Sequence, residues 1–512
     1  NLYLSSYPPL YSLILAPAYM FKDMEMVYMI MKVINALLSS LIIIPAYLLW
    51  REFFDEKKSV QGALLVGIMP LSVGIAPYLM AENLFHTLFL FAMYFVLKSI
   101  TTEESYKHSI MAGVCIAMAF LTKFTGLIVL FFMGLVMVWF MIKKQFDQVK
   151  KAAVTITVAV AIVGAWLVKN IGTKISNIKD MVDITIIKNT ESMPFQEVAL
   201  IFIVWMIIYL FYILLGTGII TNVFMGQKGS TKNSNKESAL FWLSVTFIGV
   251  LTLILAKRAV GLNIKEVTPF AGFPGRVIGR YIDFVLPLVV LLGFIGLKNK
   301  NNNFTMKRNV WVWSGIALAG FLVWYFPLFP FNNSSITVFG ALKVAIEFVI
   351  IRTIDVAHVS WITVVIMTGM IIGTLLATYK LRDKINFYNA FWCLAVFFIL
   401  SSIGSIAATA YSANSWSKSE QLGLSKQLSK EIDKSKSILI DEKFCGTPLS
   451  REGYEYICTK NKQLSYVGFW LNNNLIVGNK DEEKADYVIT RDVLDKKLIR
   501  KTQNGIMVYE QE

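Results

Sequence analysis

Two apolar stretches that meet at a short polar turn decide the fold: SVQGALLVGIMPLSVGIAPYLM (59–80), AEN (81–83) and LFHTLFLFAMYFVL (84–97). Each flank is long enough to cross most of the hydrocarbon core of a bilayer, so together they predict a helical hairpin in a membrane. An ionised carboxylate beside two spans is costly unless it faces water or a partner, which makes Glu82 a candidate functional residue. The alternative is that Glu82 only caps the second helix, because acidic residues favour helix N-termini.

The composition indicates a membrane protein along most of the chain. Of the 512 residues, 56% are hydrophobic and 16% are charged, and the mean hydropathy is +0.58. Backbone polar groups in lipid must be hydrogen-bonded within each span, so we expect a polytopic α-helical protein. The net charge of +15 does not indicate nucleic-acid binding, because Lys and Arg occur in short loops beside apolar runs, as in membrane proteins.

Hydropathy predicts about twelve spans. They are placed at residues 24–50, 59–80, 83–99, 108–122, 124–142, 152–170, 196–222, 238–256, 281–297, 309–327, 360–379 and 387–408. Every second loop is rich in Lys and Arg, and these loops are predicted to be cytoplasmic. They are residues 51–58, 98–107, 143–151, 228–236, 298–308 and 380–384. The Glu82 turn and the C-terminal region are therefore predicted to be extracytoplasmic, in a multi-pass protein of the plasma membrane.

Two further segments carry specific expectations. The chain begins at Asn1 with no span before Tyr7, so we expect a first span and the start of the first outer loop upstream, making about thirteen spans in all. Residues 337–351 are apolar but hold Lys343 and Glu347. Their spacing of four suits an exposed ion pair on one face of a helix, and we expect an amphipathic helix at the outer interface.

The composition becomes polar after residue 408, which predicts a membrane domain at 1–408 and a small extracytoplasmic α/β domain at 409–512. Helices are expected at 417–434 and 449–460, and strands at 437–441, 463–470, 474–478, 485–490 and 505–509. Cys445 and Cys458 lie in this domain. A disulfide between them is expected because the domain is predicted to be outside the cytoplasm.

The predicted outer loops hold basic residues where few are expected. These are Lys123, Lys169, Arg276 and Arg280, among others. Arg and Lys pair with phosphate oxygens, so the residues are candidates to bind a lipid phosphate. The alternative for Lys123 is that its side chain only extends from a helix end to the interface.

Several short motifs occur in a definite order. They are YPPLY (7–11) before a span, the Glu82–Asn83 turn, WLVKN (166–170) at an outer span end, and GRYIDFVLP (279–287) at an outer span start. With the C-terminal α/β domain, this order resembles the GT-C glycosyltransferases. The resemblance is strongest to the branch that holds the protein O-mannosyltransferases and the lipid A aminoarabinose transferase.

The resemblance implies a polyprenyl-phosphate (dolichyl-phosphate in some members) sugar donor and inverting transfer, at the extracytoplasmic face, to a protein, lipid or glycan acceptor. It places the main acidic base upstream of Asn1. Glu82 then binds sugar or acceptor, or holds a divalent metal, while Tyr7, Pro8 and Pro9 shape the donor cavity. The cations that neutralise the leaving phosphate are Lys123, Lys169, Arg276 and Arg280, and Asn170 and Tyr281 are expected to hydrogen-bond phosphate or sugar. Simple helix-end packing is the alternative for Asn170 and Tyr281.

Two other kinds of protein remain as alternatives. A secondary transporter is expected to show paired halves and charges in the middle of its spans, whereas the charges here gather at span ends. A non-catalytic assembly factor or polysaccharide polymerase has no need of outer cations beside a Glu turn. The sequence leaves the sugar and the acceptor open.

Overall fold

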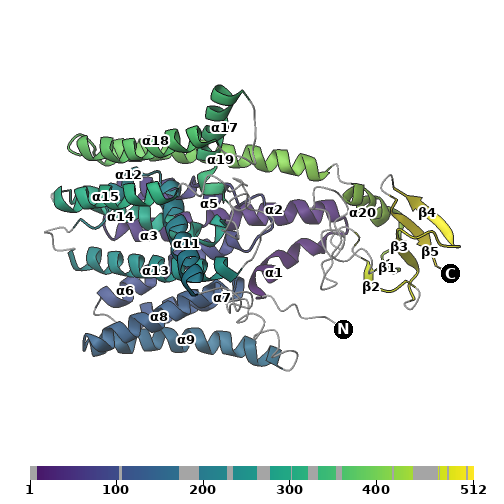
Figure 1. The fold of residues 1–512 in the computed structure, drawn as a ribbon. Helices are drawn as coiled ribbons and strands as arrows, with labels where there is room; N and C mark the ends of the chain where they lie inside the picture. The colour runs from purple at the N-terminus through teal and green to yellow at the C-terminus, as the bar shows by residue number, and fades with distance from the viewer. Residues whose placement is uncertain are drawn as a thin grey trace. The chain divides into compact units, whose positions relative to one another are not determined.

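The computed structural model is mostly helical and carries one small sheet (Figure 1). It describes residues 8–102, 106–171, 195–227, 234–261, 277–300, 303–320, 333–352, 360–417, 420–441, 471, 473–480, 484–502 and 505–511. The chain divides into two compact units. The larger is Asn1–Pro17 with Met31–Ala408, and the smaller is Ala18–Ile30 with Thr409–Glu512.

The helices of the first half of the chain begin with the short α1 (Leu10–Leu15). There follow η1 (Ala16–Met20), α2 (Met24–Ser40), α3 (Ile43–Arg51), α4 (Glu56–Gly67), α5 (Pro70–Val73), α6 (Glu82–Thr101), α7 (Lys107–Thr122), α8 (Gly126–Ile142) and α9 (Phe146–Ile171). Helix α7 packs against both α6 and α9.

The second half begins with α11 (Phe195–Gly216) and α12 (Ile220–Phe224). There follow α13 (Ser234–Gly261), η2 (Gly279–Tyr281), η3 (Asp283–Val285), α14 (Leu286–Lys298), α15 (Asn303–Ala319), η5 (Ser334–Ile336), α17 (Thr337–Ile351), α18 (Trp361–Lys380) and α19 (Phe387–Ser417).

Among the described residues, seven helical segments are long and apolar enough to cross a membrane. They are Met24–Arg51, Glu82–Thr101, Phe146–Val168, Gln196–Gly216, Asn235–Lys257, Trp361–Lys380 and Phe387–Tyr411. A multi-pass membrane protein is therefore confirmed, because helices are the spanning elements whose backbone groups are all satisfied internally. The count of about twelve spans stays a prediction.

Residues 59–80 differ from the continuous span that hydropathy predicts. Helix α4 ends at Gly67, and Met69 takes an extended conformation before Pro70 starts the four-residue α5. A proline lacks the amide proton that would continue the helix, and its ring pushes the preceding residue out of the helical region. The chain therefore reaches Glu82 through turns, and the predicted hairpin has a broken first arm.

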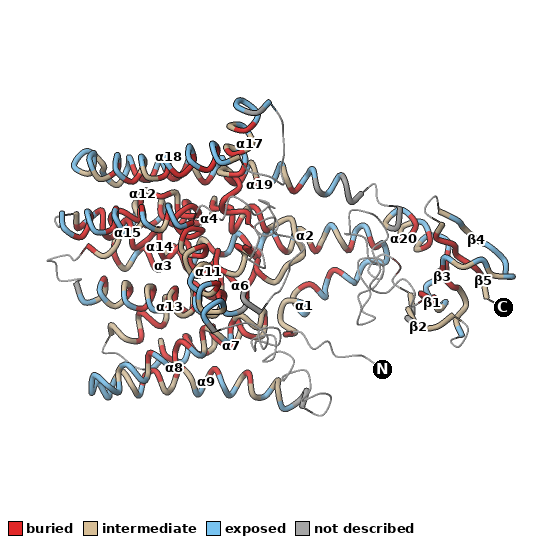
Figure 2. Tube along the Cα trace, in the orientation of Figure 1, coloured by how far each residue is buried: buried red, intermediate tan, exposed pale blue. Residues whose placement is uncertain are grey.

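Helix α14 is the centre of the larger unit. Every residue from Leu286 to Leu297 is buried, whereas α9 and α18 expose one side along their length (Figure 2). Close approach to α12 depends on Gly296, where a Cβ would lie 1.7 Å from the carbonyl oxygen of Phe224. The two short turns η2 and η3 lead directly into α14, so the buried helix fixes their position.

The expectation for residues 337–351 is corrected in one respect. Helix α17 forms with the expected bounds, and Lys343 Nζ lies 3.8 Å from Glu347 Oε2, but both side chains are buried. Glu347 Oε1 also accepts a hydrogen bond from the Ser360 amide at the start of α18. The exposed residues of α17 are apolar, including Val349 and Phe348. The spacing of four predicted the pair correctly, but burial depends on tertiary packing that the spacing does not encode.

The smaller unit holds helix α20 (Glu420–Glu431) and a five-stranded sheet of order β2-β1-β3-β5-β4. The strands are β1 (Ser437–Asp441), β2 (Asn474–Gly478), β3 (Tyr487–Thr490), β4 (Lys497–Lys501) and β5 (Met507–Glu510). Strand β1 pairs in parallel with β2 and β3, while β5 pairs antiparallel with β3 and β4. Strands predicted at 437–441 and 474–478 are confirmed with the same bounds.

Strand β4 was missed because its sequence, KLIRK, is charged and it forms an exposed edge of the sheet. Edge strands commonly carry charges, which hides the alternation that marks a strand with one buried face. The helix predicted at 449–460, the strand at 463–470, and Cys445 and Cys458 lie outside the described residues.

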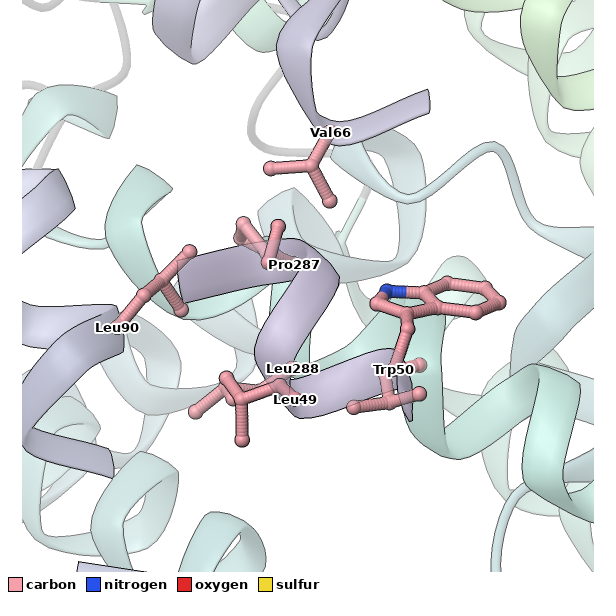
Figure 3. A pocket seen from close by; sticks show the side chains of 8 residues that line it. Leu49, Trp50, Val66, Leu90, Pro287 and Leu288 are labelled. Atoms are coloured by element: carbon pink, nitrogen blue, oxygen red, sulfur yellow. The ribbon is translucent and has the colours of Figure 1, made fainter. Parts of the chain in front are cut away.

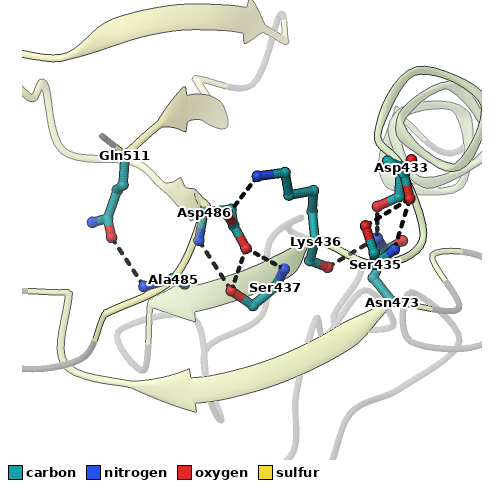
Figure 4. A network of polar contacts seen from close by, with 8 residues as sticks. All are labelled: Asp433, Ser435, Lys436, Ser437, Asn473, Ala485, Asp486 and Gln511. Carbon is teal, nitrogen blue, oxygen red and sulfur yellow. Dashed lines mark hydrogen bonds and ion pairs between the residues drawn. The ribbon is translucent and has the colours of Figure 1, made fainter.

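A carboxylate network joins the starts of β1 and β3 (Figure 4). Asp486 Oδ2 accepts hydrogen bonds from the Ser437 amide at 2.7 Å and the Ser437 hydroxyl at 2.8 Å. Asp486 Oδ1 lies 3.0 Å from Lys436 Nζ. The hydrogen bond from the Ser437 amide is the main cause that lowers the pKa of Asp486 to about 2, because it stabilises the charged form.

This network predicts how the smaller unit responds to acid. The folded pKa of Asp486 is below its ordinary value of 3.8. Its stabilisation is therefore complete above that value and is lost as the pH falls towards about 2. Hydrogen exchange of the β3 amides in the intact protein should show protection falling over this range, and Asp486→Asn should flatten the dependence. The exposed Asp495→Asn is the control, and an unchanged pH profile in Asp486→Asn contradicts the assignment.

Candidate functional site

The candidate site is built on the first residue of α6. Glu82 begins this helix and is only 4% exposed. Its carboxylate Oε1 lies 2.6 Å from Lys123 Nζ. Lys123 follows α7 in an extended conformation, so the chain turns there and brings the ammonium group to the start of α6. This contact joins two residues that are 41 positions apart in the sequence. Helix capping by Glu82 alone, or extension of Lys123 to the membrane interface alone, does not require such a contact.

Arg280 supplies a second cation from the η2 turn. Its Nε lies 3.8 Å from Glu82 Oε1, and its guanidinium carbon is 5.3 Å from the centre of the Tyr281 ring. Lys123 Nζ lies 4.8 Å from the centre of the same ring. Tyr281 therefore offers its aromatic face to both cations, an arrangement in which the ring quadrupole attracts positive charge. Four predicted residues, Glu82, Lys123, Arg280 and Tyr281, are brought together.

Close packing against Tyr212 holds the η2 turn in place. A Cβ at Gly279 would lie 2.0 Å from the Tyr212 hydroxyl oxygen, so only glycine fits there. The Gly279 amide donates a hydrogen bond of 3.0 Å to Asn333 Oδ1. The position of Arg280 is therefore set by its neighbour in the sequence as well as by its own contacts.

Buried polar residues that the sequence analysis did not select lie beside this cluster. Tyr212 donates a hydrogen bond of 2.9 Å to Asp283 Oδ1, and Asp283 is fully buried. Asp283 interacts electrostatically with both Glu82 and Lys123. His86 lies one turn after Glu82, is 3% exposed and stacks against Phe284. An acidic residue at the start of an apolar run is a signal that could have found Asp283.

The N-terminal segment contacts the turn that leads to Glu82. Pro8 is buried and Pro9 half-buried at the start of α1. Tyr11 donates a hydrogen bond of 2.8 Å to Asn35 Oδ1, and Asn35 in turn donates one of 2.9 Å to the Tyr78 carbonyl. Burial raises the pKa of Tyr11 to about 12, so the phenol stays protonated as a donor.

Asn83 reaches the same carbonyl of Tyr78 with its side-chain amide at 3.0 Å. Asn35 in α2 and Asn83 in α6 thus share one backbone oxygen, and Tyr11 in α1 is linked to it through Asn35. This fixes the broken arm before α6, and with it the direction from which Glu82 enters the cluster.

Several predicted site residues cannot be placed beside this cluster. Tyr7 and Arg276 lie outside the described residues. Lys169 and Asn170 belong to the last turn of α9, and their side chains lie outside the description. Within the described ranges, no group of three or more His, Cys, Asp or Glu side chains gathers to hold a metal ion.

An apolar pocket lies in the core rather than at the polar cluster (Figure 3). It is lined by Leu49, Trp50, Val66, Leu90 and Pro287, among others, and leaves no room for a water molecule. Leu90 is eight residues along α6 from Glu82, or about 12 Å at the helical rise. This pocket is a packing imperfection and has no part in the candidate site.

The ion pair of Glu82 and Lys123 predicts a specific coupling. Lys123→Met leaves Arg280 as the one ion-pair partner of the buried Glu82 carboxylate among the described residues, and should lower the free energy of unfolding by about 3 kcal/mol. Adding Glu82→Gln removes the uncompensated charge, so the double variant should be more stable than Lys123→Met alone. Thermal unfolding in detergent measures both. Strictly additive effects of the two substitutions would contradict a direct contact.

Comparison with known proteins gives one family match and several structural ones. Residues 6–168 match the family described as dolichyl-phosphate-mannose-protein mannosyltransferase. No curated protein matches the chain. The crystal structure of ArnT from Cupriavidus metallidurans bound to undecaprenyl phosphate is 10% identical, with a TM-score of 0.44, and the match covers 98% of this chain and 87% of that one.

Two further solved structures match at similar levels. ArnT from the same organism in the apo state is 12% identical, with a TM-score of 0.46 and the same coverage of 98% and 87%. The archaeal oligosaccharyltransferase AglB from Archaeoglobus fulgidus, in complex with an inhibitory peptide and a dolichol-phosphate, is 12% identical with a TM-score of 0.38. That match covers 93% of this chain and 56% of AglB.

The matched segment contains the Pro8–Pro9 motif, Glu82 and Lys123. The match over residues 6–168 therefore bears out the resemblance of this part of the chain to the protein mannosyltransferases.

Proposed function

We propose that this protein moves a sugar from a polyprenyl-phosphate donor to an acceptor at the extracytoplasmic face of the plasma membrane, with inversion at the sugar carbon. The family match supports a membrane glycosyltransferase of the GT-C type. The observation that carries the finer proposal is the contact of one buried carboxylate with two cations, Lys123 and Arg280, at the start of α6.

The charge of the cluster favours an anionic ligand. Glu82 contributes one negative charge, and Lys123 and Arg280 contribute two positive charges, so the three contacting groups carry a net positive charge. Lys123 is 14% and Arg280 22% exposed at the side chain, against 5% for Glu82. The cations are thus the more accessible partners, and a lipid phosphate that reaches the cluster meets positive charge first.

The chemistry follows from where charge develops during transfer. The acceptor oxygen bonds to the sugar carbon while the bond from that carbon to the phosphate oxygen breaks, and the electron pair leaves with the polyprenyl phosphate. Fixed cations in a poorly hydrated site stabilise that leaving anion. Lys123 and Arg280 are placed for this role, and Tyr281 holds both through its ring face.

Glu82 is better suited to holding than to proton abstraction. A carboxylate that already contacts two cations is a weak base, so it positions Lys123 and Arg280 and offers an acceptor to a sugar hydroxyl. The acceptor's proton passes to a separate acidic residue, as the resemblance implies. The donor cavity that the resemblance implies is proposed to include four further residues: Lys169, Asn170, Arg276 and Tyr7.

A transfer assay tests the proposal. Membranes that contain the protein should transfer radiolabel from a polyprenyl-phosphate pentose or hexose to an endogenous acceptor. Arg280→Ala should reduce the rate by ~100-fold, because loss of one charge-stabilising group commonly costs that much. Glu82→Gln should also reduce the rate, because the carboxylate positions both cations. The exposed Asp147→Asn is the matched carboxylate control and should keep full activity. Normal transfer by both site variants would remove the site assignment.

The proposed topology has its own test. In a background where the native cysteines are replaced by serine, Val493→Cys should react with a membrane-impermeant maleimide in intact cells, because the Val493 side chain is exposed and the smaller unit is proposed to be extracytoplasmic. Asp147 lies in the first turn of α9, within the basic stretch 143–151 that is proposed to be cytoplasmic, and its side chain is 90% exposed; its replacement by Cys is the comparison. It should react only after permeabilisation, and the reverse labelling pattern would overturn the orientation.

A further inference from the structure

A patch of large apolar side chains lies on the smaller unit, in the segment between η1 and the first turns of α2. Tyr19, Met20, Phe21, Met26 and Met29 are all exposed, and Met20 is 85% exposed. Water-soluble surfaces rarely carry so many neighbouring apolar side chains without a partner. The patch is therefore a candidate interaction surface.

The segment is held against the rest of the smaller unit by polar contacts on its other side. Lys434 Nζ donates a hydrogen bond of 2.5 Å to the Lys22 carbonyl, and Lys426 Nζ lies 3.3 Å from Glu25 Oε1. Lys426 and Lys434 belong to α20 and the turn that follows it. Residues 18–30 therefore fold as part of this unit, while the five side chains of the patch remain exposed.

The patch continues into a membrane-spanning helix. Along α2, the exposed apolar residues recur at Met26, Met29, Val33 and Leu37, which is the spacing of one helical face. The opposite face, with Met24, Val27 and Met31, is buried. Met26 and Met29 of the patch therefore lie on the same face of α2 as Val33 and Leu37.

The length of the span explains why the patch reaches the headgroups. The apolar segment Met24–Arg51 has 28 residues, or about 42 Å of helix, whereas the hydrocarbon core is about 30 Å thick. With Arg51 at the opposite interface, the surplus of about 12 Å brings Met26 and the residues before it to the headgroup region. Tyr19 and Phe21 are residues suited to that depth, and the exposed Lys22 suits anionic headgroups.

We propose that residues 19–29 form an interfacial foot by which the α/β unit rests on the bilayer, with Tyr19, Met20, Phe21, Met26 and Met29 inserted among the lipid headgroups and upper acyl chains. The partner is the phospholipid surface. This assignment gives the smaller unit a membrane contact of its own, independent of the chemistry at Glu82.

Site-specific photo-crosslinking tests the proposal. The purified protein carrying p-benzoylphenylalanine in place of Met20 is reconstituted in vesicles of phosphatidylethanolamine and acyl-radiolabelled phosphatidylglycerol, irradiated and stripped of free lipid. The matched control carries the same residue in place of Val493, which is equally exposed at 85% and lies in the same unit between β3 and β4. Because both positions are exposed, neither replacement disturbs the core.

Several-fold more lipid label at position 20 than at position 493 is the expected result. Equal labelling at the two positions would overturn the proposal, since it would mean that the patch has no preferred contact with lipid. Adducts between two copies of the chain as the main product at position 20 would also overturn it, by showing that a second copy covers the patch. The readout requires no donor sugar and is independent of transferase activity.

Discussion

A carboxylate withdrawn from water must have positive charge beside it, and this requirement on Glu82 organises one end of the larger unit. Isolated in an apolar environment, an ionised carboxyl group is costly enough that it would take up a proton instead. The contact with Lys123 and Arg280 removes that cost. It also obliges the end of α7 and the η2 turn to stay at the start of α6, so one electrostatic demand fixes three chain segments.

Packing in the rest of the unit holds the segments around Glu82 in place. The central helix α14 is buried on every side and has η2 and η3 at its start, so Arg280 in η2 is positioned by a fully buried helix. On the other side, the Tyr78 carbonyl collects hydrogen bonds from Asn35 and Asn83. The segment before Glu82 has no regular helix, but side-chain hydrogen bonds to the Tyr78 carbonyl hold it in place.

Charged residues within apolar sequence predicted which side chains form the cluster around Glu82. Glu82, Lys123 and Arg280 were identifiable because each stands out at a span end, and their convergence is a consequence of the cost of burying charge. Asp283 and His86 carry the same signal but were passed over, since their partners, Tyr212 and the Phe284 ring, come from packing that hydropathy does not reveal. Hydropathy likewise does not distinguish α14, surrounded by protein, from a lipid-facing helix.

Hydropathy predicted the wrong local structure in two places where single residues carried the better signal. Pro70 breaks the predicted 59–80 span although the surrounding residues are apolar, and the charged strand β4 lacks the alternation of a half-buried strand. The smaller unit was otherwise accessible, because β1 and β2 are short apolar runs bounded by polar residues. Residues 18–30 belong to that unit because of contacts with residues far away in the sequence, and the local sequence does not predict those contacts.

The buried pair of Lys343 and Glu347 gives α17 an unusual rigidity. Glu347 also accepts a hydrogen bond from the Ser360 amide at the start of α18, so turning α17 about its axis would separate the buried ion pair from that amide and break the hydrogen bond. The helix therefore has one allowed azimuth. Any rearrangement in this part of the bundle must move α17 and the first turn of α18 as a single piece.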